Sequence, residues 1–274
     1  MKPWRTIRSG NVELVVEVVG QGAPIIYGHG LTSRRQTTLD QLSCLTKHYQ
    51  VIAFDQRGHG DSSPITSPAL YSADLMVQDF IAIMDSLGIA RAIVGGESMG
   101  AAVALLFAMQ APERVAALLL TAPAFGGKEP NQGKAQVQEM GRAISNPGME
   151  AYLRYSAENQ RTRLGWPLEA VSYVAQMQSA HHPQSLATAC QAVMEWRILE
   201  DLTPLSALEF PVCIVGWPND LLHPIKLAQQ MKEHFRNADL IEIPPLPELF
   251  VRPGLIGQIY GDFLVRMEGA GGRV

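Results

Sequence analysis

The chain has 274 residues, of which 47% are hydrophobic and 18% charged, a composition typical of a folded globular protein. The formal net charge is -4 and no run of Lys and Arg occurs, so the sequence does not predict a nucleic-acid-binding surface. No apolar stretch approaches the roughly 20 residues that span a bilayer, and the first residues lack the apolar region of a signal peptide. We therefore expect a cytoplasmic protein that has no contact with a membrane.

Strand-like and helix-like segments alternate along the first half of the chain. Strands are predicted from alternating or continuous apolar runs at residues 12–19, 23–27, 50–54, 92–95 and 115–121. Helices are predicted at residues 71–87, which are amphipathic and followed by Gly88 as a C-cap, and at residues 99–110, which are apolar nearly all round. This alternation indicates an α/β fold with a mostly parallel central sheet and helices on both faces.

The pattern changes near residue 126. From there to about residue 206, strand signals are nearly absent and helical segments punctuated by Gly and Pro dominate, which indicates an inserted helical cap. Later strands are predicted at residues 211–216 and 238–243, and later helices at 224–235 and 254–267. We expect the core to comprise residues 1–125 and 207–268, the cap residues 126–206, and a flexible tail residues 269–274.

Residues 96–100 read G-E-S-M-G, a G-x-S-x-G motif between a predicted strand and a predicted helix. In that context a sharp turn lifts the hydroxyl of Ser98 above the sheet. Gly96 and Gly100 lack the Cβ atoms that would collide across the turn, and the N-terminus of the helix favours negative charge near Ser98. The motif predicts a nucleophilic serine on an elbow; the alternative is an ordinary strand–helix turn.

Three other segments follow predicted strands. Residues 29–31 read H-G-L, residues 55–62 read D-Q-R-G-H-G-D-S, and Asp220 stands in the segment G-W-P-N-D-L-L-H-P. Together with the elbow, these segments resemble the α/β-hydrolase superfamily, in its branch of lipases, lactonases and C–C hydrolases. The resemblance covers about residues 12–126 and 204–265 and implies the α/β-hydrolase fold.

The resemblance also implies roles for individual residues. The backbone N–H groups of Leu31 and Met99 would bind the oxyanion that develops in acyl transfer, where one such donor is worth about 10²–10³ in rate. Asp220 matches the catalytic acid that orients the histidine of a triad, and its alternative is an aspartate that caps the next helix. The segment 55–62 is assigned mainly to structure, with Arg57 paired to a carboxylate.

The family's catalytic histidine follows the last strand, but residues 243–253 contain no His in this chain. Glu248 falls at or near that position and is the candidate base, because a carboxylate in a dry pocket can have a raised pKa. Its alternative is a surface glutamate in a Pro-rich loop. His223, three residues after Asp220, is assigned to the D-x-x-H-P turn common in the family, with a role as base as its alternative. The triad is therefore predicted to be degenerate.

The candidate pocket draws on several parts of the chain. We expect five residues to line the substrate pocket: His29, Glu97, Trp166, Trp196 and His223. His29 is also expected to fix its loop by bonding backbone, and the two tryptophans could equally form the core of the cap. His181 and His182 are adjacent in the cap, where they form either a solvated helix end or a contact that reaches the pocket from above. The three cysteines show no metal-ligand spacing, and neither a metal nor a cofactor is predicted.

Three functions remain open at this point. The first is a hydrolase that acts on a small ester, lactone or related acyl substrate through Ser98, with an atypical base. The second is a catalytically impaired pseudohydrolase that binds a small molecule under the cap, which the absent histidine favours. The third is a lyase or isomerase that uses the oxyanion hole without acyl transfer. All three have a small molecule as partner.

Overall fold

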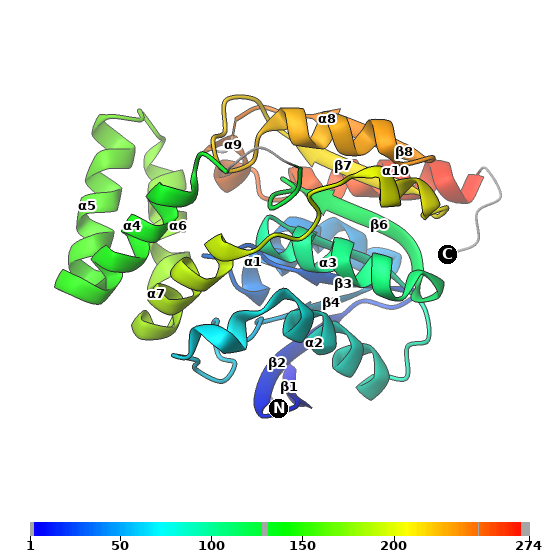
Figure 1. Cartoon of the computed structure of the whole chain (residues 1–274), viewed down its shortest axis with the longest axis horizontal. Helices are drawn as coiled ribbons and strands as arrows, with labels where there is room; N and C mark the ends of the chain where they lie inside the picture. Colours follow the sequence, from blue (N-terminus) through cyan, green and yellow to red (C-terminus); the bar gives the residue numbers. More distant parts are fainter. Residues whose placement is uncertain (1–2, 128–130, 246, 270–274) are drawn as a thin grey trace.

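An eight-stranded sheet forms the centre of the structure, a computed structural model that describes residues 3–127, 131–245 and 247–269 (Figure 1). The strand order is β1-β2-β4-β3-β5-β6-β7-β8. The first two strands pair antiparallel, β2 also runs antiparallel to β4, and the remaining pairs are parallel. The strands are β1 (Trp4–Ser9), β2 (Val12–Val19), β3 (Ala23–Gly28), β4 (Tyr49–Phe54), β5 (Ala92–Glu97), β6 (Val115–Thr121), β7 (Val212–Gly216) and β8 (Ala238–Glu242).

Side chains that alternate along the strands pack into two hydrophobic cores, one on each face of the sheet. In β3, Ile25 and Tyr27 join one core while Ile26 joins the other, as the two-residue period of a strand requires. The core around Tyr27 includes side chains of α1 (Arg35–Leu42) and α10 (Leu255–Gly269). The opposite core includes side chains of α2 (Ala73–Ser86), α3 (Met99–Gln110) and α8 (Ile225–His234). The predicted α/β-hydrolase fold, with a mostly parallel sheet and helices on both faces, is confirmed.

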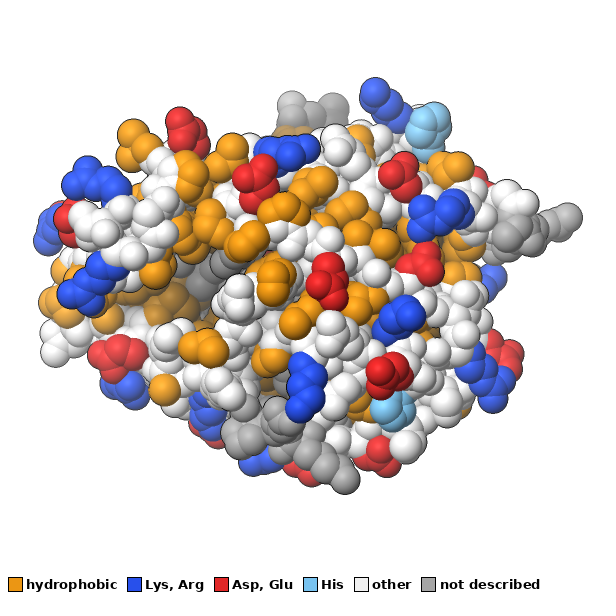
Figure 2. All heavy atoms as spheres, turned by 90° about the horizontal axis from the view of Figure 1, so that it is seen from above, with side chains coloured by type: hydrophobic (Ala, Val, Ile, Leu, Met, Phe, Trp, Pro, Cys, Tyr) orange, Lys and Arg blue, Asp and Glu red, His pale blue; other side chains and the backbone are white. Residues whose placement is uncertain are grey.

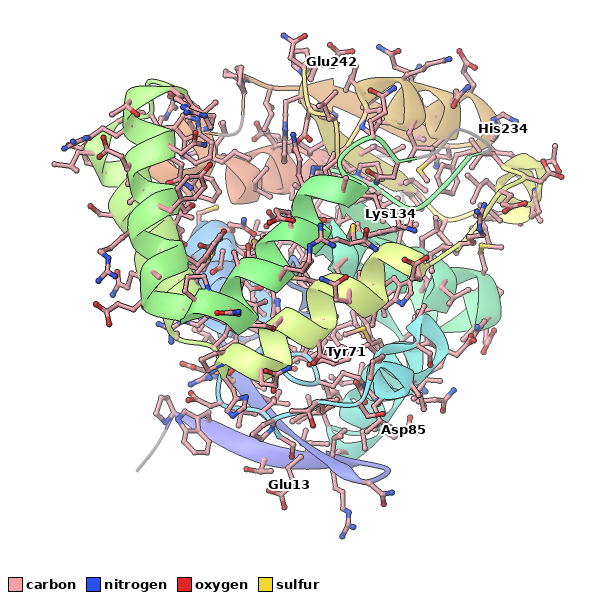
Figure 3. All side chains as sticks on the ribbon, turned by 60° about the vertical axis from the view of Figure 1, so that its left-hand side comes forward. Glu13, Tyr71, Asp85, Lys134, His234 and Glu242 are labelled. Carbon is pink, nitrogen blue, oxygen red and sulfur yellow. The ribbon has the colours of Figure 1, made fainter. Side chains whose placement is uncertain are left out.

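Helices α4 to α7 lie between β6 and β7 in the chain and stand beside one end of the sheet in Figure 1. They are α4 (Lys134–Ala143), α5 (Met149–Thr162), α6 (Leu168–Ser179) and α7 (Pro183–Ala192), and we call them the helical segment. Figure 3 shows α4 and α7 side by side. A bridge between Gly126 and Leu199 joins the chain where it enters and leaves this part. The limits of the cap at residues 126 and 206, and of the other domains, stay predictions.

Several short elements complete the fold. They are η1 (Ser43–Lys47), η2 (Pro68–Tyr71), η3 (Pro112–Arg114), the π-helical turn η4 (Ile144–Gly148), η5 (Val193–Glu195), η6 (Thr203–Ala207) and α9 (Pro247–Val251). None of the described helices is both long enough and apolar enough to cross a lipid bilayer. Of the predicted tail, Gly269 is the last residue of α10, and residues 270–274 lie outside the described residues.

The segment 55–62, assigned mainly to structure, is held by a buried ion pair. Arg57 donates from Nε and Nη2 to the two carboxylate oxygens of Asp79 on α2, each at 2.7 Å. A third hydrogen bond joins Arg57 Nη1 to the carbonyl of Leu70. Both charged side chains are almost completely buried. A bidentate pair of this kind satisfies the guanidinium only while the carboxylate is present.

Removing one partner of this pair should destabilise the fold. We expect Asp79→Ala to lower the free energy of unfolding by about 3–5 kcal/mol, because the buried guanidinium then lacks its carboxylate. Urea unfolding followed by circular dichroism measures the loss. Glu150→Ala is the control, since it removes the carboxylate from the exposed pair with Arg154 and should cost less than about 1 kcal/mol. Equal losses in the two variants would contradict the structural role of the buried pair.

Candidate active site

Ser98 occupies the turn between β5 and α3 with φ of 53° and ψ of -110°, a backbone conformation that non-glycine residues rarely adopt. Its N–H donates to the carbonyl of Thr121 on β6 at 2.9 Å. A Cβ on Gly96 would lie 2.2 Å from the carbonyl carbon of Gly100, and a Cβ on Gly100 would lie 2.0 Å from the carbonyl oxygen of Gly28. The tight turn therefore depends on glycine at both positions.

Ser98, His223 and Asp220 form a continuous row of hydrogen bonds. The hydroxyl of Ser98 lies 2.7 Å from Nε2 of His223, and Nδ1 of the same ring lies 2.9 Å from Oδ2 of Asp220. All three residues are mostly shielded from solvent. Asp220 and His223 both belong to the loop between β7 and α8, where they stand three residues apart.

The carboxylate of Asp220 is surrounded by donors. Besides the ring of His223, the indole N–H of Trp217 donates to Oδ2 at 2.8 Å, and the backbone N–H groups of Leu222 and His223 donate to Oδ1 at 2.8 and 3.1 Å. Burial raises the pKa of this carboxyl, but the hydrogen bond and charge of His223 and the bond from Trp217 outweigh burial and hold the pKa well below its usual range. Asp220 is therefore a fixed anion that points at Nδ1 of His223.

Glu248 does not take the base position that the sequence predicted for it. It lies on α9, with Oε1 3.4 Å from Nη1 of Arg252, and its side chain is 41% exposed. Within the described part of the chain, the hydrogen-bond partner of the Ser98 hydroxyl is His223. The predicted contact of Glu248 with the serine is therefore not seen: Glu248 pairs with Arg252, and His223, in the loop after β7, lies against Ser98. Which residue acts as the base stays a prediction.

Two backbone N–H groups follow the ends of β3 and β5, which are neighbouring parallel strands. Met99 is the first residue of α3, so its N–H has no acceptor inside the helix. Leu31 follows β3 in the loop that carries His29 and Gly30. Among the described residues, neither of these two N–H groups donates a hydrogen bond. The loop after β3 and the start of α3 thus hold the two donors that the resemblance singles out.

Two of the candidate pocket residues are held by protein groups. The ring of His29 is buried between the carbonyl of Gly30, 2.8 Å from Nδ1, and the N–H of Gln56, 3.0 Å from Nε2. Its ring nitrogens therefore bond backbone, the alternative expected for this residue. The carboxylate of Glu97 accepts a hydrogen bond from Gln41 at 2.7 Å. Burial raises the pKa of Glu97, while the bond from Gln41 and the charge of His223 act in the opposite direction.

The two tryptophans lie apart from each other. The ring of Trp166 packs against that of Phe250 of α9 in a tilted arrangement, with 5.8 Å between the ring centroids. Trp196 donates from Nε1 to the carbonyl of Tyr71 at 2.8 Å and lines a cavity of about 970 Å³ that Asp220 also borders. Figure 2 shows hydrophobic side chains around a hollow beside the helical segment. A role for either tryptophan in substrate binding stays a prediction.

The described residues contain no group of three or more His, Cys, Asp and Glu side chains placed to hold a metal ion. Cys190 and Cys213 are buried and Cys44 is partly buried. Burial raises the pKa of both buried thiols to about 12, which keeps them protonated and unreactive near neutral pH.

A mostly parallel sheet that carries a serine on a strand–helix turn, beside a histidine and an aspartate, is the arrangement in which serine hydrolases of this topology place their reactive groups. Residues 23–246 match the family model described as the alpha/beta hydrolase fold. The chain belongs to this family.

Individual relatives agree with the assignment. The chain is 28% identical over 253 residues to the "Putative carbamate hydrolase RutD" of Caulobacter sp. (strain K31), an alignment that covers 85% of this chain and 88% of the relative. The structure of this chain is similar to that of a thermophilic esterase from Thermogutta terrifontis, with a TM-score of 0.79 and 22% identity. The comparison covers 97% of this chain and 99% of the esterase chain. It is also similar to the enol-lactonase from Burkholderia xenovorans LB400, with a TM-score of 0.78, 19% identity and coverage of 96% and 100%. These two structural similarities show the fold.

The elbow geometry gives a direct prediction for Gly100. We expect Gly100→Ala to lower the free energy of unfolding by about 1–3 kcal/mol or more, because the new methyl group would overlap the carbonyl of Gly28. Thermal unfolding measures the shift. Gly254→Ala is the matched control, since a Cβ there meets no atom within 4 Å. If both variants unfold at the wild-type temperature, α3 does not need this close approach to the sheet.

Proposed function

We propose that the protein is a serine hydrolase with a complete triad, in which Ser98 is the nucleophile, His223 the general base and Asp220 the acid that orients the base. The observation that carries the proposal is the 2.7 Å contact between Ser98 Oγ and His223 Nε2. A base must lie within about 2.6–3.2 Å of the proton that it removes, and this pair meets that requirement. The 2.9 Å contact of Nδ1 with Asp220 leaves Nε2 of a neutral ring free to accept the proton of the serine.

The reaction proceeds in two steps. Ser98 Oγ forms a bond to the carbonyl carbon of the substrate while its proton moves to Nε2 of His223, and the carbonyl oxygen becomes an oxyanion. The N–H groups of Leu31 and Met99 stabilise that oxyanion, each worth about 10²–10³ in rate. The imidazolium then returns the proton to the leaving alcohol or amine as the bond to the leaving group breaks. Water attacks the acyl-enzyme by the same route and releases the acid.

The family resemblance and the elbow support a choice among substrate classes. A relative that aligns with most of the chain is named "Putative carbamate hydrolase RutD", and two proteins with the same fold are an esterase and an enol-lactonase. Some relatives that match less than half of the chain are named epoxide hydrolases. Because Ser98 stands where the superfamily's epoxide hydrolases use an aspartate, we favour a small ester, lactone or carbamate over an epoxide.

The pseudohydrolase hypothesis rested on the absence of a histidine after the last strand. Since His223 contacts Ser98 from another loop, that reason no longer favours it. A lyase or isomerase would use the same oxyanion donors without forming an acyl-enzyme. Formation of an acyl-enzyme on Ser98 during ester turnover separates the hydrolase from both alternatives.

Ser98 should react with a fluorophosphonate. We expect labelling of the wild type within minutes and a mass increase of one adduct located on Ser98, because His223 removes the proton as Oγ attacks phosphorus. Intact-protein and peptide mass spectrometry measure both. Ser98→Ala should not be labelled. A folded wild type that resists the probe at every pH from 6 to 9 would rule out serine hydrolysis.

The identity of the base is tested by two variants. His223→Ala should reduce kcat for a p-nitrophenyl ester by about 10⁴–10⁶, the range typical for loss of a triad histidine. Glu248→Gln should leave kcat within about threefold of wild type, because Glu248 pairs with Arg252 and not with Ser98. The reverse result, a large loss in Glu248→Gln with near-normal turnover in His223→Ala, would restore Glu248 as base.

A further inference from the structure

Three buried histidine rings contact one another beneath the loop that follows β3. The rings of His29 and His59 lie 5.2 Å apart between centroids, and those of His59 and His181 lie 5.4 Å apart, in both cases edge to face. Such a cluster could suggest a metal site. However, every one of the six ring nitrogens lies within hydrogen-bonding distance of a backbone group. The ring nitrogens therefore face backbone groups and do not point together at one position where a metal ion could bind.

The acceptors on one side of the cluster are three consecutive carbonyl groups. Nδ1 of His29 lies 2.8 Å from the carbonyl of Gly30, and Nε2 of His59 lies 2.8 Å from the carbonyl of Leu31. Nε2 of His181 lies 3.0 Å from the carbonyl of Thr32. We call these three rings the histidine clamp. The histidine clamp contacts the carbonyl groups of residues 30–32, the stretch that contains the N–H of Leu31.

The opposite nitrogens of two rings fix their tautomers. Nε2 of His29 accepts from the N–H of Gln56 at 3.0 Å, and Nδ1 of His181 accepts from the N–H of Gly60 at 3.1 Å. Each ring must therefore carry its proton on the nitrogen that faces the loop carbonyl. Burial, together with the neighbouring His59, lowers the pKa of His181 to about 3, so this ring is neutral over the working range of an enzyme.

The peptide geometry connects the clamp to Leu31. The carbonyl of Gly30 and the N–H of Leu31 belong to one planar trans peptide, so they point in opposite directions. A donor that holds the Gly30 carbonyl therefore also fixes the direction of the Leu31 N–H. Both Nδ1 of His29 and the N–H of Ser33 hold that carbonyl, at 2.8 and 3.0 Å. Hydrogen bonds to the carbonyl also polarise the peptide and strengthen its N–H as a donor.

His181 differs from the other two rings in its origin. His29 and His59 come from loops at the ends of β3 and β4, whereas His181 stands between α6 and α7 of the helical segment. Neighbouring contacts hold the same junction: Ser185 Oγ accepts from the N–H of Ile65 at 2.9 Å, and Tyr71, labelled in Figure 3, donates to the carbonyl of Ser185 at 3.0 Å. His181 is thus the ring through which the helical segment contacts the loop of Leu31.

We propose that His181 is a positioning residue of the hydrolase, which couples the docking of the helical segment to the geometry of the Leu31 N–H. The ring does not touch the reacting atoms; it holds the Thr32 carbonyl and the Gly60 N–H, and through them the loop beside Ser98. The proposal rests on the serine-hydrolase function proposed above. The proposal requires Nε2 of the ring to donate to the Thr32 carbonyl and Nδ1 to accept from the Gly60 N–H.

Two substitutions at His181 separate the hydrogen bond made by Nε2 from the hydrogen bond made by Nδ1. The amide of Gln reaches the position of Nε2, so His181→Gln keeps a donor for the Thr32 carbonyl. The shorter Asn reaches the position of Nδ1, so His181→Asn keeps an acceptor for the Gly60 N–H and loses the bond to Thr32. We expect His181→Asn to lower kcat for p-nitrophenyl acetate by about 10–100-fold with little change in KM, since a displacement near 1 Å can cost about 10² in rate. His181→Gln should recover most of the loss.

The readouts distinguish positioning from folding. A boronic acid that forms a tetrahedral adduct on Ser98 should bind His181→Asn more weakly, by the same factor as kcat falls, because the adduct oxygen uses the oxyanion donors. His182→Gln is the control: His182 accepts from the N–H of Ser185 at the start of α7 and bonds no carbonyl of residues 30–32. That variant should keep wild-type kcat. If His181→Asn fails to fold, the same Asn and Gln pair at His59 tests the clamp through the Leu31 carbonyl.

Each outcome supports or overturns a defined statement. Wild-type kcat and boronate affinity in His181→Asn would overturn the positioning role while Ser98 labelling still supports the hydrolase. An equal loss of kcat in the Asn, Gln and His182→Gln variants would show a general effect on packing and also overturn it. A wild type that neither labels with fluorophosphonate nor turns over ester would overturn the proposed function first, and the role of His181 with it.

Discussion

The close approach of α3 to the sheet is the constraint on which the site depends. Gly100 touches the backbone of Gly28 so closely that no side chain fits between them, and Gly96 meets Gly100 in the same way. This contact places Ser98 at the sharp end of β5 with a positive φ and leaves the N–H of Met99 at the open end of a helix. Strain at one backbone position is acceptable because the packing of two elements determines it.

The second feature of the site is that one loop supplies both the acid and the base of the proposed triad. Asp220 and His223 are three residues apart, and the backbone N–H groups of Leu222 and His223 bind the same carboxylate that receives the ring. The carboxylate is therefore oriented by its own loop and by Trp217 before any substrate enters. The stretch after β8, where the family's histidine usually stands, is released from catalysis in the proposed mechanism. Preorganised donors of this kind require no rearrangement when charge develops on the imidazole.

The sequence predicted the elements whose apolar pattern is strong. The bounds of β2, β6 and α3 agree with the predicted ranges, because buried strands and a buried helix must be apolar. In contrast, β1 is an edge strand in which half of the side chains are exposed, and α1 is largely polar, so neither produces a clear period. At the site, Ser98 and Asp220 lie within local sequence motifs, so the sequence alone could single them out. His223 was assigned to the turn, with a role as base only as its alternative, since its contact with Ser98 depends on how the loop bends at Asn219, which has φ of 62°. The spacing of Asp220 and His223, combined with the missing later histidine, was the available signal.

The histidine clamp shows why local motifs cannot determine such a site completely. His29 and His59 belong to recognisable segments, but the third ring comes from a part of the chain whose sequence carries no transferable pattern. The helical segment therefore has two separable roles in the proposed enzyme. Its surface toward the hollow shapes what can bind, whereas His181 holds the backbone that stabilises the transition state. On this proposal, changes on that surface alter substrate choice without loss of rate, whereas the junction between α6 and α7 has to keep the ring of His181 in place.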